Sequence, residues 1–319
     1  MTAARPYLLI ARVGRHSLHR RWLGNGGRQR GFDVLLSYYD ADTPVSAAEG
    51  VHIEHRPGTK VGGIGALLAE HAVRIGGYRH VAIFDDDLDI DAAGIHRLFA
   101  LADRHGFLVC QPALSHDSFF TFAGLLSNPG YEFRSTTFVE MMCPCFRNDM
   151  LPAVRAIYTM GYESGLDLLW CNLLGQAPGR YAVIDAVSVR HTRPVGGQRH
   201  ANGFTGGARY EEHIHAVLAR FALPWLPCVP YFGRRRDGRL VRGRLALLLS
   251  SLRIAAAVPR RGGGLRRLTA VLIHWKHLLL HRPRNLRVEQ LGHLAAHVDI
   301  GDRPVRPSDR LRAGMVPRA

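Results

Sequence analysis

The residues best suited to chemistry lie in the segment 81–91, VAIFDDDLDID. Five aspartates fall within seven residues there, directly after an apolar run typical of a buried strand. Asp85 and Asp87 are one residue apart, so their carboxylates would point to the same side of an extended chain. Carboxylate oxygens are preferred ligands of Mg²⁺ and Mn²⁺, which also bind phosphate oxygens. The pair indicates a divalent metal beside a diphosphate, and a solvated acidic turn before a helix is the competing interpretation.

The next two aspartates suit a structural role. Asp89 and Asp91 come just before an amphipathic segment at 92–106, and short carboxylates commonly cap the first turn of a helix. We therefore predict that these two residues form the turn and the N-cap of that helix.

Strand-like and helix-like segments alternate in the first part of the chain, and this alternation predicts the fold. The pattern indicates an α/β protein with a mostly parallel sheet and helices on both faces. Ligands bind such sheets outside the carboxyl ends of the strands, where the acidic cluster would lie. The predicted strands are 6–13, 32–40, 51–56, 80–87 and 107–114, and the predicted helices are 60–76 and 92–106.

Composition favours an intracellular globular protein. Hydrophobic residues make up 47% of the 319 residues. The longest apolar candidate for a membrane span, 245–258, is short and contains Arg253, and the N-terminal apolar stretch is too short for a signal peptide. The five cysteines are an odd number with one close pair, Cys143 and Cys145, which favours buried free thiols over a zinc site. We expect a cytoplasmic location, with peripheral attachment to the inner face of the membrane as an option.

Positive charge is concentrated in the last third of the chain. The formal net charge is +16; residues 209–319 contain 22 basic and 7 acidic residues, a net of +15, which leaves +1 for residues 1–208. This shift predicts a catalytic domain over 1–208 and a basic, mainly helical region over 209–319. Two of its segments, 233–261 and 264–284, join arginine clusters to apolar helical stretches.

Two interpretations of this basic region remain open. Basic amphipathic helices bind anionic membrane surfaces, and a helical subdomain packed on the catalytic domain would show the same pattern. Nucleic-acid binding is disfavoured, because the region lacks interleaved stacking aromatics, zinc-finger spacing and an RNA-recognition signature.

Several later segments place polar residues inside apolar runs, and together with the acidic strand end they resemble domain-of-unknown-function family 707. Its pattern has an Asp-Glu-Asp-Leu strand end, Gln-Pro-Ala-Leu, Phe-Val-Glu-x-Met-x-Pro-x-Phe, Gly-Leu-Asp and Val-Asp-x-x-x-Val-x-His. The matching positions here are Asp85 to Leu88, Gln111 to Leu114, Phe138 to Phe146, Gly165 to Asp167 and Ile184 to His191. Order and spacing agree from about residue 6 to 195. The chain departs from the pattern at Asp86, where the family tends to have Glu, and at Ile184, where it has Val.

That family in turn resembles nucleotide-sugar glycosyltransferases of the A-type fold, and this resemblance implies a metal site. Asp87 and His191 would hold Mn²⁺ or Mg²⁺ against the donor diphosphate, and Asp85 would contact the metal or the donor ribose. Without the resemblance, His191 would be taken for one of many surface histidines in a chain that has 18.

The resemblance also implies donor contacts. Lys60, in the sequence GTK, matches a family lysine and would neutralise donor phosphate, although it equally suits an ordinary helix start. Asp86 would belong to the donor site, and Gln111 and Asp185 would shape the pocket. Trp170 and Cys171 are expected in the core.

The predicted catalytic base is Asp167. An acceptor hydroxyl must lose its proton as it attacks the sugar, while a metal stabilises the departing diphosphate. The resemblance implies a base at the start of a helix that faces the donor, and SGLD (164–167) is such a start. However, Ser164 followed three residues later by an acid is also a helix-capping pattern. Glu140 is the second candidate, as an alternative base, a ligand of acceptor hydroxyls, or a buried carboxylate.

These residues predict a metal-dependent glycosyltransferase that transfers a sugar from a nucleotide-sugar donor to a glycan or lipid-linked acceptor. One alternative is a non-catalytic module that binds nucleotides, polysaccharide or anionic lipid. The other is a phosphohydrolase with Asp85 as its nucleophile. That chemistry needs a downstream lysine, and Lys276 lies far away in the basic region.

Overall fold

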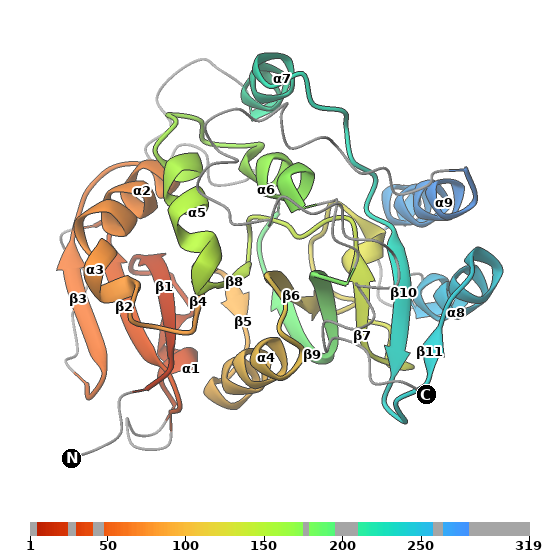
Figure 1. The fold of residues 1–319 in the computed structure, drawn as a ribbon, viewed down its shortest axis with the longest axis horizontal. Coiled ribbons are helices and arrows are strands. Elements are labelled where there is room, and N and C mark those ends of the chain that lie inside the picture. The colour runs from red at the N-terminus through yellow and green to blue at the C-terminus, as the bar shows by residue number, and fades with distance from the viewer. Residues whose placement is uncertain are drawn as a thin grey trace.

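The protein is built around one large β-sheet (Figure 1). A computed structural model describes residues 5–24, 30–40, 48–174, 179–194, 210–257 and 264–280. The strands are β1 (Tyr7–Val13), β2 (Asp33–Tyr38), β3 (Val51–His55), β4 (His80–Phe84), β5 (Leu88–Asp89), β6 (Val109–Leu114), β7 (Tyr131–Thr136), β8 (Cys145–Arg147), β9 (Tyr181–His191), β10 (Pro230–Arg235) and β11 (Leu240–Val241). The helices are α1 (His19–Leu23), α2 (Lys60–Glu70), α3 (Ala72–Ile75), α4 (Ala92–His105), α5 (Leu151–Tyr158), α6 (Leu166–Leu174), α7 (Tyr210–Arg220), α8 (Arg244–Ala257) and α9 (Gly264–Leu280), with 3₁₀ turns η2 (Ala123–Leu125) and η3 (Asn148–Met150).

Most strands of the sheet run in one direction. The order is β11-β10-β7-β9-β6-β8-β4-β1-β2-β3, and β5 pairs separately with β9. Strands β1 to β4, β6, β9 and β10 point the same way, whereas β7, β8 and β11 run against them. The predicted α/β architecture with a mostly parallel sheet is therefore confirmed. The carboxyl ends of β4, β6 and β9 share one edge.

Helices cover both faces of the sheet, as predicted. Side chains alternate along β1, so Tyr7 and Arg12 lie on opposite faces. Tyr7 stacks on Phe99 of α4, with ring centroids 4.9 Å apart. Arg12 lies against α2, where a Cβ at Gly63 would be only 2.5 Å from the guanidinium carbon, so that position needs a glycine. Helix α1 packs with α4, and α2, α5 and α6 pack one against the next on the other face.

The helix predicted at 92–106 forms with the expected ends. The Asp91 side chain accepts a hydrogen bond from the Gly94 N–H at 2.7 Å, so Asp91 is the N-cap. Gly106 ends the helix in the left-handed conformation, with φ 62°, which favours glycine. The predicted strand at 80–87, in contrast, ends at Phe84, and the next residues form a turn into β5.

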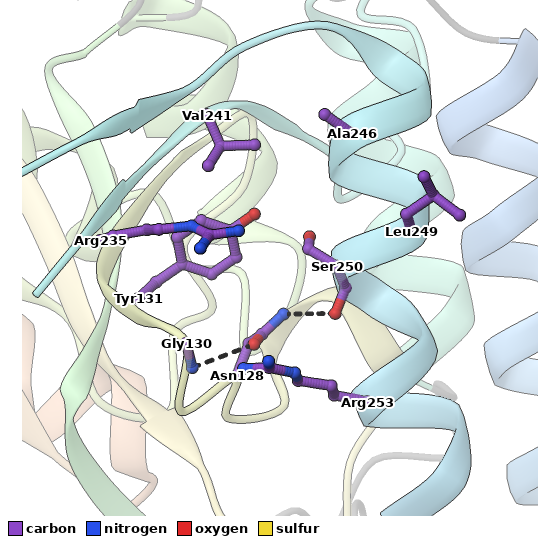
Figure 2. Close-up of a pocket in the computed structure, with 9 residues that line it drawn as sticks. All are labelled: Asn128, Gly130, Tyr131, Arg235, Val241, Ala246, Leu249, Ser250 and Arg253. Atoms are coloured by element: carbon purple, nitrogen blue, oxygen red, sulfur yellow. Dashed lines mark hydrogen bonds between the residues drawn. The ribbon is translucent and has the colours of Figure 1, made fainter.

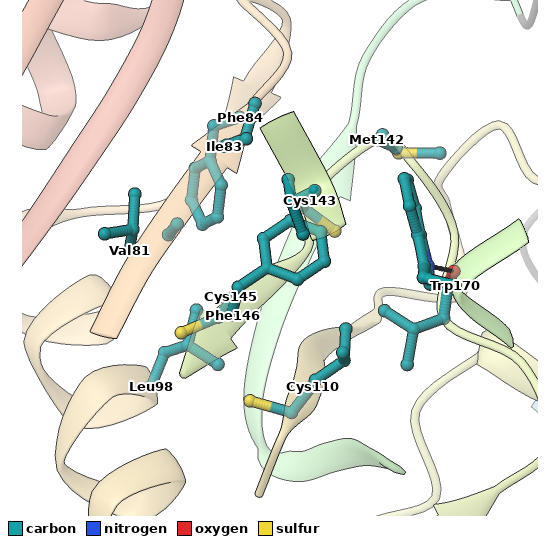
Figure 3. Close-up of a cluster of buried hydrophobic side chains, with 14 of the residues drawn as sticks. Val81, Ile83, Phe84, Leu98, Cys110, Met142, Cys143, Cys145, Phe146 and Trp170 are labelled. Atoms are coloured by element: carbon teal, nitrogen blue, oxygen red, sulfur yellow. Dashed lines mark hydrogen bonds between the residues drawn. The ribbon is translucent and has the colours of Figure 1, made fainter. Parts of the chain in front are cut away.

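An apolar cluster lies between β4, β6, β8 and α6 and supports this turn (Figure 3). Trp170 and Cys171 are fully buried, as predicted, and the Trp170 indole N–H donates to the Val139 carbonyl at 2.9 Å. All five cysteines are buried free thiols, also as predicted. Burial raises the pKa of the Cys143 and Cys145 thiols well above the ordinary value, so these groups stay protonated.

The sequence analysis predicted that Asp185 shapes the pocket, but in the structure it is buried in the core against Arg134. Its carboxylate is fully buried and accepts two hydrogen bonds from the Arg134 guanidinium, at 2.8 and 2.9 Å. The Asn128 N–H donates to it at 2.8 Å. The carboxylate of Asp185 therefore ties β9 to β7 through Arg134.

The basic C-terminal region continues the sheet. The predicted boundary at 208/209 lies outside the described residues. Beyond it, β10 pairs with β7 and β11 with β10, so the described part of the region contains strands as well as the predicted helices. Helix α7 packs on α6, α9 packs on η2, and α8 lies beside α9 (Figure 1). No described helix is long and apolar enough to cross a membrane.

Candidate active site

The short pairing of β5 with β9 brings Asp87 and His191 together. Leu88 pairs with His191 in an antiparallel register. The backbone N–H and hydroxyl of Thr192 both donate to the Asp87 carbonyl, at 3.1 and 2.8 Å. The imidazole Nε2 of His191 consequently lies 3.2 Å from Oδ2 of Asp87. Two of the three predicted metal ligands are therefore in direct contact, although they are far apart in sequence.

The orientation of the His191 ring directs Nε2 toward Asp87. Nδ1 lies 3.0 Å from the Phe119 carbonyl, which can only accept, so Nδ1 carries the proton. Burial lowers the pKa of His191, but the hydrogen bond and the charge of Asp87 outweigh burial and raise it. A histidine that donates through one nitrogen to a carbonyl is held in the geometry of a metal ligand at the other nitrogen.

Asp87 also has an oxygen without a partner. The residue is 7% exposed, and its Oδ1 atom is buried with no hydrogen-bond partner in the described part of the chain. A buried carboxylate oxygen in this state costs free energy unless a ligand satisfies it. A divalent cation at Oδ1, with Nε2 of His191 nearby, fits both the carboxylate–imidazole ligand set and the empty hydrogen-bonding position.

Asp85 forms an ion pair with Lys60 at the start of α2. The chain turns after Phe84 and is not extended at Asp85 and Asp87, so the placing of these two side chains on one side of a strand stays a prediction. Burial raises the pKa of Asp85 to about 6, against the opposing effect of Lys60. The charges of Asp87 and His191 also affect this pKa, so the two pairs belong to one site.

Hydrogen bonds of Thr59 and Glu163 fix the start of α2, and with it the backbone of Lys60. Thr59 is the N-cap of α2 and accepts from the Gly62 N–H at 3.2 Å, while its hydroxyl donates to Glu163. The Val61 N–H donates to the same carboxylate at 3.2 Å. Lys60 therefore begins a helix, as one interpretation predicted, and it also forms an ion pair with Asp85. Its contact with donor phosphate stays a prediction. Glu163 was not identified from the sequence, although it directly precedes the SGLD motif.

Asp167 and Glu140 form the second pair of carboxylates. Asp167 accepts from the N–H groups of Leu168 at 3.0 Å and Met141 at 3.4 Å, and burial raises its pKa to about 6. Glu140 is 7% exposed, and burial, followed by repulsion from Asp167, raises its pKa to about 7. Its Oε2 atom is buried without a partner among the described residues. Two neighbouring carboxyls with raised pKa values are suited to accept and donate protons near neutral pH.

The remaining predicted donor residues have different surroundings. Gln111 is fully buried, and its Oε1 accepts from the Glu140 N–H at 2.7 Å, so it positions the Glu140 loop. Asp86 accepts hydrogen bonds from the Tyr39 hydroxyl at 2.8 Å and from Arg193 at 3.2 Å. Their direct contact with a donor stays a prediction.

Tyr158 is a buried tyrosine near the site carboxylates that sequence reasoning missed. Its hydroxyl is buried on α5 and has no hydrogen-bond partner in the described ranges. Burial, and then the charges of Asp85 and Asp167, raise its pKa. In the sequence it resembles an ordinary core aromatic of an amphipathic helix, and only the fold brings it under the influence of these two charges.

One other group of potential metal ligands exists among the described residues. The ligand atoms of Glu54, Glu70 and His71 lie within 4.8 Å of one another, and Asp85, Asp87 and His191 do not form such a group. Arg56 already binds both glutamates, which accounts for this cluster without a metal. At the predicted site, Asp87 and His191 are assembled, and Asp85 is held by Lys60.

No family model matches this chain, and no curated protein matches its sequence, so the resemblance to family 707 stays a prediction. Solved structures do match. The S. aureus TarS 1–349 crystal structure is 12% identical, with a TM-score of 0.39, covering 85% of this chain and 89% of that chain. The crystal structure of GalNAc-T7 with UDP, GalNAc and Mn²⁺ is 9% identical, with a TM-score of 0.45, covering 69% of this chain and 48% of that chain. Residue roles in this chain rest on its own contacts.

The raised pKa of Glu140 predicts a pH-dependent stability. The ordinary pKa is 4.5 and the folded value is about 7, so between these values only the folded chain keeps the proton. The free energy of unfolding should fall as pH rises from about 4.5 to about 7, by on the order of 3 kcal/mol, and then level off. Glu140→Gln should show a smaller decrease, due only to the other buried carboxylates Asp85 and Asp167, whose pKa values are raised to about 6.

Urea unfolding in metal-free buffer at several pH values measures the effect. Glu212→Gln, at an exposed glutamate of α7, is the matched control and should follow the wild type. Parallel pH curves for the wild type and Glu140→Gln would contradict the assignment.

Proposed function

We propose that this protein is a metal-dependent glycosyltransferase that uses a nucleotide-sugar donor. The observation that carries the proposal is the Asp87–His191 contact at the carboxyl edge of the sheet, with a buried Asp87 oxygen lacking a partner. Mn²⁺ or Mg²⁺ held by Asp87 and His191 would neutralise the diphosphate that leaves the sugar. An acidic turn after a central strand of an α/β sheet is also what the resemblance to A-type glycosyltransferases implies.

The other side chains of the site would bind the donor phosphate and accept the acceptor's proton. Lys60 would bind donor phosphate once a metal or donor draws it from Asp85. Asp167, with a pKa of about 6, is largely ionised at neutral pH and can accept the proton of an acceptor hydroxyl. Glu140, whose pKa is about 7, would bind acceptor hydroxyls or take over the proton. The proposed acceptor is a glycan or a lipid-linked glycan in the cytoplasm.

One observation favours a second function. The Lys60–Asp85 ion pair supplies a lysine beside the aspartate that a phosphohydrolase would use as its nucleophile. The sequence analysis looked for this lysine only downstream, at Lys276. A phosphohydrolase would release inorganic phosphate from phosphomonoesters with Mg²⁺, and the proposed transferase would not.

Asp87→Asn should remove metal-dependent donor binding. Asn keeps the size of the side chain and one acceptor oxygen, but it loses the charge that holds a cation. Calorimetry with a panel of nucleotide sugars, with and without Mn²⁺, measures the effect. The Mn²⁺-dependent affinity should fall by more than the 10–100-fold that is typical when a residue hydrogen-bonded to a metal ligand is mutated. Asp89→Asn is the control, since Asp89 lies two residues after Asp87 and forms an ion pair with the exposed Arg21 of α1. Equal Mn²⁺-dependent affinity in both variants would refute the metal assignment.

Asp167→Asn should separate catalysis from structure. Asn can still accept one backbone N–H, and burying a neutral group costs less than burying a carboxylate, so stability should not fall. Removal of a general base should slow transfer by about 10²–10⁴-fold. Rates are compared at saturating donor and Mn²⁺, with donor affinity as the control for folding. A variant with full transfer activity would move the role of base to Glu140.

A further inference from the structure

A cavity of about 320 Å³ lies between β7, β10, β11 and α8 (Figure 2). None of the residues assigned to sugar transfer lines it. Arg235 of β10 and Arg253 of α8 enter it from two sides, and no acidic side chain is among its lining residues. This composition favours an anionic ligand.

The two arginines are available for such a ligand. Within the described ranges, neither side chain has a hydrogen bond or ion pair, whereas the neighbouring Arg234 binds Glu132 at 3.2 Å. A Cβ at Gly130 would lie 2.8 Å from Nη1 of Arg253, so glycine allows the guanidinium to lie close to the backbone. Two guanidinium groups provide the planar donor arrays that match phosphate oxygens.

The buried hydroxyl of Tyr131 is a second, independent observation that indicates a ligand in the cavity. The residue is 1% exposed, yet its hydroxyl has no hydrogen-bond partner among the described residues. Its ring packs directly on β10, where a Cβ at Gly233 would lie 2.4 Å from a ring carbon. A buried hydroxyl without a partner is costly, and a phosphate oxygen in the cavity could accept its hydrogen bond.

A row of exposed leucines on α8 adjoins the cavity. On α8, Leu245, Leu249 and Leu252 are 70%, 65% and 46% exposed, and their spacing places them on one side of the helix. Leu249 also lines the cavity. The neighbouring α9 exposes a similar row, formed by Leu265, Leu268 and Leu272. Exposed apolar rows of this size mark an interaction surface.

We propose that the cavity binds the phosphate of an anionic phospholipid while the leucine rows of α8 and α9 enter the bilayer interface. Charge complementarity selects this occupant: residues 230–257 and 264–280 contain ten Lys and Arg and a single acid, Asp237. Free phosphate would use the arginines and leave the leucines exposed to water. An anionic lipid surface would bind the arginines through its phosphates and bury the leucines among its acyl chains. The inference is independent of the proposed transferase activity.

The test is co-sedimentation of the full-length protein with phosphatidylcholine vesicles that contain or lack phosphatidylglycerol. The wild type should bind only the anionic vesicles. The double variant R235Q/R253Q should bind roughly 25-fold more weakly, since each basic residue near an anionic surface contributes about a factor of five. The matched control R97Q/R155Q loses the same charge from exposed sites on α4 and α5 and should bind like the wild type.

Two further variants separate the parts of the site. Tyr131→Phe, with no change of charge, should weaken vesicle binding several-fold. Leu245→Ser with Leu252→Ser should weaken vesicle binding and leave calorimetric binding of inorganic phosphate unchanged. An equal loss of vesicle affinity in R235Q/R253Q and R97Q/R155Q would contradict the assignment of the cavity as the phosphate site. Phosphate binding without vesicle binding, or a wild type that does not co-sediment with anionic vesicles, would overturn the lipid assignment.

Discussion

The two-residue pairing of β5 with the end of β9 is the contact on which the candidate site depends. It joins the turn after β4 to a strand about a hundred residues later, and it places Asp87 beside His191. Thr192 fixes the turn through two hydrogen bonds to one carbonyl. Without this pairing, Asp87 would be a solvated turn residue and His191 a surface histidine. Both of these alternatives were reasonable from the sequence.

The site concentrates more negative charge than its cations balance. Asp85, Asp87, Glu140 and Asp167 gather around Lys60 and His191, and burial raises the pKa of Asp85, Glu140 and Asp167. Burial of these carboxylates costs stability that a well-packed apolar core would not lose. A bound divalent cation would remove much of that cost, so the metal would stabilise the fold as well as the leaving diphosphate. This link between charge, burial and metal connects the fold to the proposed chemistry.

Local patterns in the sequence predicted most elements up to residue 114, because their causes are local. Asp91 and Gly106 mark the ends of α4, and apolar runs mark the strands. The predictions failed where long-range contacts decide. The ion pairs of Asp85 with Lys60 and of Asp185 with Arg134 join residues far apart in sequence, and the sequence indicated neither pair. Tyr158 resembles a core residue until the fold places it near the acids, and β10 was hidden by its arginines.

The central claim is that a divalent cation binds at Asp87 and His191. The most direct measurement is a crystal of the full chain soaked with Mn²⁺ and a nucleotide diphosphate, examined by anomalous scattering at the manganese edge. The account predicts one anomalous peak within coordination distance of Asp87 Oδ1 and His191 Nε2, about 2.0–2.2 Å, with diphosphate oxygens on its other side. A nucleotide bound there without such a peak, or a manganese peak only at Glu54, Glu70 and His71, would contradict it.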